Sequence, residues 1–121
     1  MKNTIIERVR AFFLQSMPEE KVTASFNADQ LQVMLPDGSI CIMIRTKIQM
    51  IGILTTSSGP FLEDVYWAIS DHESTIFVPQ KSADFSSLLS DFQTMPNFNN
   101  DAFIDAMCCT EDRLFVCWER E

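Results

Sequence analysis

Apolar residues recur at helical spacing near the start of the chain and then at a spacing typical of strands. Residues 4–16 place five apolar side chains on one helical face, and Thr4 with Glu7 has the spacing of a capping box. Four segments with alternating or continuous apolar residues follow and predict strands; these are residues 22–26, 31–35, 40–44 and 48–54. Pro36 and Gly38 predict a tight turn between the second strand and the third. We expect an antiparallel meander of four strands, with the helix available to cover one face.

The second half of the chain predicts a hairpin, two helices and a closing strand. Residues 61–69 and 74–79 favour strands, joined by a turn at 70–73. Apolar residues then recur at helical spacing over 84–93. A second helix follows the loop 96–100, where an Asn can cap it; its core-lining residues are Ala102, Phe103, Ala106 and Met107. The closing strand is expected at 114–118.

These elements predict one α+β domain over residues 1–121. It would contain an N-terminal helix and an antiparallel sheet, followed by a hairpin, two helices and the closing strand. The length of 121 residues suffices for one domain of ordinary size and is short for two.

The chain is acidic, and its acids are concentrated in the second half. The formal net charge is −8. Residues 1–60 carry five acids and six bases, whereas residues 61–121 carry twelve acids and three bases. This field repels phosphate backbones, which argues against direct nucleic-acid binding, and it speeds encounter with basic partners. Acidity also keeps a protein soluble, so charge alone does not establish a binding role.

Cysteine usage favours a reducing compartment and argues against a zinc site. The sequence has four cysteines, no CxxC motif, and His72 as its single histidine. Three cysteines lie in apolar sequence and are expected to be small core residues: Cys41, Cys108 and Cys117. The adjacent pair Cys108-Cys109 suggests a redox switch as an alternative, but Glu111 and Asp112 would oppose a thiolate there.

No segment predicts export or membrane insertion. Charges at Glu7, Arg8 and Arg10 interrupt the hydrophobic region that a signal peptide needs, and the longest apolar run is too short for a membrane span. We expect a cytoplasmic protein that binds no membrane. We also expect no catalytic centre, no metal and no cofactor, because the sequence lacks a nucleophile elbow, a glycine-rich phosphate loop and metal-ligand spacing.

The candidate functional residues are acids and aromatics of the second half. Glu63 and Asp64 precede Tyr66 and Trp67, a combination that can hold a metal or anchor a protein partner. We favour a protein-binding role over a metal site, because no DxD or ExxH spacing offers the additional metal ligands that such a site needs. Alternatively, Trp67 packs in the core and the two acids form its hydrated edge. The candidate set is completed by acids near predicted turns: Asp71, Glu73, Glu111 and Asp112. His72 lies between Asp71 and Glu73, and we expect it to be a solvated turn residue rather than a pH sensor or general acid.

Five blocks of sequence carry a family resemblance: residues 59–67, 78–80, 95–100, 103–107 and 117–120. Together they resemble small bacterial immunity proteins, the antidotes encoded beside polymorphic or contact-dependent growth-inhibition toxins. The resemblance spans roughly half the chain and implies a cytoplasmic protein that caps a toxin domain, without fixing any residue as functional.

The resemblance thus implies an immunity protein, and the lack of a catalytic motif argues against an enzyme. Its expected partner is a cognate, cationic toxin domain, with a nuclease and especially a ribonuclease favoured, since an acidic block can mimic a polyanion and cover the active site. The alternatives are an acidic accessory or regulatory protein for another basic partner, or a small enzyme with an unfamiliar site.

Overall fold

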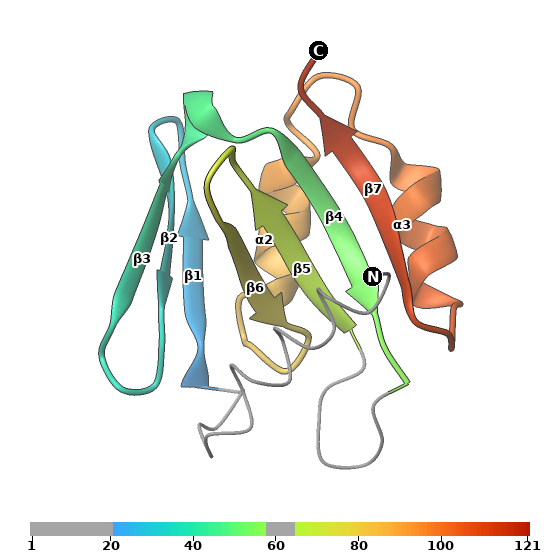
Figure 1. Ribbon diagram of the computed structural model, residues 1–121, viewed down its shortest axis with the longest axis horizontal. Helices are drawn as coiled ribbons and strands as arrows, with labels where there is room; N and C mark the ends of the chain where they lie inside the picture. Colours follow the sequence, from blue (N-terminus) through green and yellow to red (C-terminus); the bar gives the residue numbers. More distant parts are fainter. Residues whose placement is uncertain (1–20, 58–64) are drawn as a thin grey trace.

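Two antiparallel sheets, two α-helices and a short 3₁₀ helix make up the described structure, a computed structural model that covers residues 21–57 and 65–121 (Figure 1). The small sheet has the order β1-β2-β3, with β1 at Thr23–Phe26, β2 at Gln30–Met34 and β3 at Ile40–Ile44. The large sheet has the order β6-β5-β4-β7, with β4 at Met50–Thr55, β5 at Val65–Ser70, β6 at Thr75–Pro79 and β7 at Arg113–Glu119. The helices are α2 (Phe85–Phe92), α3 (Asn100–Met107) and the short 3₁₀ helix η2 (Arg45–Lys47).

The α+β class and the predicted elements of the second half are confirmed. The hairpin, both helices and the closing strand lie within a few residues of their expected bounds. Asn99 caps α3, because its side-chain oxygen accepts a hydrogen bond from the Ala102 amide at 3.0 Å. The helix expected at 4–16 lies outside the described residues.

The predicted four-stranded meander is wrong at its last strand. β4 does not pair with β3; it follows η2 into the large sheet and lies between β5 and β7. β4 joins the large sheet because its side chains are buried on both faces of the strand. Residues 51–55 of β4 are all buried, as suits a central strand, whereas β3 exposes every second residue.

A β-bulge fits β7 against β4 and depends on a glycine. The pairing register shifts between Ile51, which lies opposite Trp118, and Gly52, which lies opposite Val116. A Cβ atom on Gly52 would lie 2.7 Å from the carbonyl oxygen of Phe115. Only glycine permits this close approach of the two backbones.

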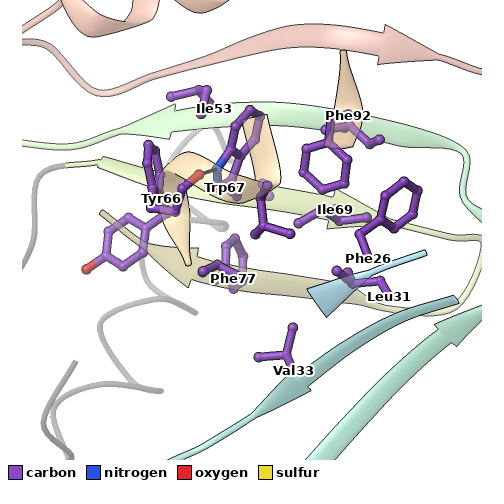
Figure 2. Packing of buried hydrophobic residues seen from close by; sticks show 14 of the residues in the cluster. Phe26, Leu31, Val33, Ile53, Tyr66, Trp67, Ile69, Phe77 and Phe92 are labelled. Carbon is purple, nitrogen blue, oxygen red and sulfur yellow. Dashed lines mark hydrogen bonds between the residues drawn. The ribbon is translucent and has the colours of Figure 1, made fainter. Parts of the chain in front are cut away.

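An aromatic cluster around Trp67 joins the large sheet to both helices, and Figure 2 shows Trp67 together with Phe92 of α2 in this core. The Trp67 ring centroid lies 5.4 Å from that of Phe85, 5.0 Å from that of Phe92 and 5.5 Å from that of Phe103. The indole nitrogen donates a hydrogen bond to the carbonyl oxygen of Phe85 at 3.0 Å. Phe92 also meets Phe26 of β1 at 4.9 Å, so the same cluster reaches the small sheet.

Two polar contacts tie the outer edge of β1 to the start of α2. The buried Ser82 hydroxyl donates to the carbonyl oxygen of Val22 at 2.6 Å. The carboxylate of Asp84 accepts from the amide of Ala24 at 2.8 Å. These bonds satisfy backbone groups that an edge strand would otherwise leave to solvent.

Candidate protein-binding surface

The two aromatic residues of the predicted binding set are core residues. Tyr66 and Trp67 are completely buried, because β5 is flanked by β4 and β6 and is buried on both faces. Neither side chain can reach a partner on the surface of this fold, so the alternative placing of Trp67 in the core is the correct one. Glu63 and Asp64 lie outside the described residues.

Asp71 and Glu73 lie in the turn between β5 and β6. The Asp71 carboxylate accepts hydrogen bonds from the amides of Glu73 and Ser74, both at 2.8 Å, and these bonds lower its pKa below the ordinary value. Asp71 thereby stabilises the turn. The exposed His72 and Glu73 line a shallow depression of about 310 Å³ together with Lys47, so His72 is a surface turn residue as expected.

Glu111 and Asp112 lie in the connection from α3 to β7. One Asp112 carboxylate oxygen accepts from the amide of Ser57 at 2.6 Å and from its hydroxyl at 3.0 Å. The main-chain oxygen of Glu111 accepts from the buried Thr55 hydroxyl at 2.6 Å. These contacts fix the connection against the end of β4 and leave the Glu111 side chain exposed.

The structure separates these two acidic pairs instead of bringing them together. Thr55 pairs with Arg113 at the end of β4 near Glu111 and Asp112, whereas Met50 pairs with Ser70 at the other end, next to Asp71. The six residues of β4 lie between them, a separation of roughly 17 Å along the strand. The predicted acidic set is therefore not one surface.

The outer side of α3 carries an acidic and apolar surface, and Glu111 is its one member from the predicted binding set. Asp101, Ile104, Asp105 and Cys108 are all exposed and follow the i, i+3, i+4, i+7 spacing of one helical face. Ile104 is 57% exposed, and the neighbouring Met107 is 36% exposed. We call the following residues the α3 surface: Asp101, Ile104, Asp105, Met107, Cys108 and Glu111.

A shallow depression extends the α3 surface towards β7. It has a volume of about 410 Å³, and its lining includes Asp105, Cys108 and Glu111 together with Arg113. The Arg113 guanidinium lies 4.8 Å above the ring of Phe115. Residues 100–112 contain four acids and no base, so the helix and the following connection are uniformly negative. The sequence did contain a signal, because Asp101 and Asp105 occupy positions of α3 that the core-lining residues leave free.

The cysteines differ in environment more than the sequence predicted. All four are free thiols; Cys117 is buried, and its burial raises the pKa of the thiol to about 11. Cys108 is exposed, so its predicted place in the core is wrong: it follows the last residue of α3 on the outer face. Cys41 and Cys109 are half-buried.

Within residues 21–57 and 65–121, no three His, Cys, Asp or Glu side chains are grouped as metal ligands would be. Among the helices described, none is both long and apolar enough to cross a membrane.

Comparison with known proteins adds no relative: no protein-family model, curated protein or solved structure matches the chain.

Proposed function

We propose that the protein is a cytoplasmic immunity protein that neutralises a cationic toxin domain by binding it, with the α3 surface as the central contact. The observation that supports this most directly is the exposure of Ile104 and Met107 among the acids Asp101, Asp105 and Glu111. Exposed apolar side chains with charges around them are typical of protein–protein contacts.

The two kinds of residue have separate roles in this proposal. Ile104 and Met107 supply apolar area that leaves water on binding. The acids attract a basic surface over a distance and select it over neutral or acidic ones. A nuclease that grips phosphates offers such a basic groove, so a ribonuclease domain is the favoured partner. Inhibition by occupancy requires no catalytic residue in the inhibitor.

The test uses the toxin domain encoded by the gene next to the one for this chain. Cells that produce this domain alone should stop growing, and co-production of the full chain should restore growth. Purified proteins should bind in a calorimeter at a ratio of one to one. Absence of both rescue and binding would refute the proposal, whereas binding without rescue would support an accessory protein instead.

A pair of charge reversals locates the contact. Asp105→Lys with Glu111→Lys should weaken binding by roughly 30- to 1000-fold, because each reversal replaces an attraction of about 0.5–1 kcal/mol by a repulsion of similar size. The matched control is Asp29→Lys with Glu73→Lys, which makes the same change in net charge on exposed residues away from α3. Equal weakening by both pairs would show that the α3 surface is not the contact.

A further inference from the structure

β3 presents an exposed apolar edge to solvent. Ile40, Ile42 and Ile44 share the outer face of the small sheet and are 52%, 54% and 44% exposed. Met34 lies opposite Ile40 on β2 and extends this apolar face. Edge strands in soluble proteins are usually protected by a charge or a proline, yet residues 40–44 contain neither. The unprotected edge suggests that it is covered by another strand.

The backbone groups of the same three isoleucines point away from the sheet. The carbonyl of Ser39 accepts from the Leu35 amide at 2.8 Å, and the Arg45 amide donates to the Asp29 carbonyl at 2.9 Å. Odd-numbered residues therefore face β2, and the alternation of an antiparallel ladder directs the even-numbered residues outward. The outward residues are Ile40, Ile42 and Ile44.

The two edges of the small sheet differ in how they are covered. At β1, Asp84 and Ser82 bond to the outward backbone groups of Ala24 and Val22. At β3, the part of the chain that the structure describes places no strand on the outer side (Figure 1). Within the described residues, the outward backbone groups of β3 thus have no hydrogen-bond partner, as pairing with an added strand requires.

We propose that two copies of this chain associate through β3, in antiparallel register with Ile42 on the two-fold axis. This register sets Ile40 of one copy opposite Ile44 of the other, so all three outward residues pair through about six backbone hydrogen bonds. The isoleucines form one continuous apolar stripe across the contact, and the two small sheets become one sheet. A two-fold contact of this kind is closed and does not propagate into fibres.

Charges at the two ends of β3 favour antiparallel pairing of the two β3 strands over parallel pairing. Asp37 lies in the turn before β3, and Lys47 lies in η2 directly after it; both are exposed. In the antiparallel register, the end of β3 that follows Asp37 in one copy lies beside the end that precedes Lys47 in the other. A parallel pairing would instead oppose each of these charges with its own copy, which is repulsive. This charge complementarity identifies the occupant of the edge as a second copy.

The dimer is independent of the proposed function. β3 and α3 lie on opposite sides of the molecule (Figure 1). Association through β3 leaves both α3 surfaces open, so each copy could still bind a partner. Failure of either proposal would leave the other standing.

Sedimentation velocity of the full chain over a range of concentrations tests the proposal. We expect a species of twice the 13.9 kDa chain mass at the higher concentrations. Ile42→Lys should raise the dimer dissociation constant roughly 100-fold or more, because it removes the central apolar pair and places two like charges across the axis. Ser25→Lys is the matched control. It adds the same charge to an exposed residue of β1, on the sheet face that also carries Ile42 but away from the β3 edge. This control should leave the dimer intact.

Cysteine substitutions test the register separately. Ile42→Cys would place two thiols in directly opposed residues with Cα atoms about 5.5 Å apart, within reach of a disulfide. Ile40→Cys would place its thiol about 13 Å along the strand from that of the other copy, beyond reach. On mild oxidation, only Ile42→Cys should yield a covalent dimer beyond the level of the unsubstituted chain.

A charge exchange tests the ends of the strand. Lys47→Asp should weaken the dimer, and adding Asp37→Lys to it should restore the association. The proposal is overturned by a chain that stays monomeric throughout, by a dimer that Ile42→Lys leaves intact, or by equal cross-linking of both cysteine variants. A monomer that binds lipid vesicles or a foreign strand through β3 would also overturn it.

Discussion

Trp67→Phe should destabilise the fold by about 2–3 kcal/mol, since the substitution keeps an aromatic ring but removes specific contacts of a completely buried indole. Loss of the hydrogen bond to the Phe85 carbonyl, 3.0 Å long, accounts for about 1 kcal/mol. The smaller ring leaves a void of roughly 40 Å³ among Phe85, Phe92 and Phe103, which costs about 1 kcal/mol. Lost apolar burial supplies the remainder.

Urea denaturation followed by far-ultraviolet circular dichroism measures this loss without relying on tryptophan emission. Trp118→Phe is the matched control: its indole also donates to a carbonyl, that of Pro96 at 2.9 Å, but it lies on an edge strand. We expect a smaller loss there, about 1 kcal/mol. A change below about 0.5 kcal/mol at Trp67, or loss of toxin-domain binding at unchanged stability, would refute its role as the centre of the core.

Gly52→Ala should destabilise by about 1–3 kcal/mol, because its Cβ would lie 2.7 Å from the Phe115 carbonyl oxygen; a neutral result in urea denaturation would contradict the bulge geometry. In thiol labelling at pH 8, Cys108 should react in the native state, whereas Cys117, with its pKa raised to about 11, should react only after unfolding. Rapid native labelling of Cys117 would show that the β7 packing is wrong.

The sequence predicted where the elements lie better than how the strands pair. Alternation correctly located β1, β2 and β3, since each has one exposed face. The run from Ile48 to Leu54 was assigned to the same meander because it follows directly. Its apolar residues occupy positions of both parities, however, which is typical of a central strand covered on two faces. Pairing to β5 and β7 depends on contacts distant in sequence, which local pattern does not encode.

The same reasoning explains the outcome for the aromatic residues. Residues 65–69 are apolar without interruption and form a strand buried on both faces, so Tyr66 and Trp67 had to be core residues. Their neighbours Glu63 and Asp64 suggested a surface instead. On α3, Ala102, Phe103 and Ala106 face the core as predicted, but the prediction for Met107 is wrong because this side chain is exposed. The outward positions of the helix hold Asp101, Ile104 and Asp105.

The separation of the acidic pairs also decides how salt should affect the two charge-reversal variants. At physiological ionic strength the screening length is about 8 Å, roughly half the ~17 Å that separates the two ends of β4. Glu73 would therefore act weakly on a partner bound at α3, and Asp29→Lys with Glu73→Lys should be nearly silent. At about 0.01 M salt the screening length reaches ~30 Å and the whole acidic field steers association. Both variants should then slow the association rate in stopped-flow measurements, whereas only Asp105→Lys with Glu111→Lys should speed dissociation at either salt concentration. A control pair that speeds dissociation at physiological salt would place the contact near Asp29 or Glu73 instead of at α3.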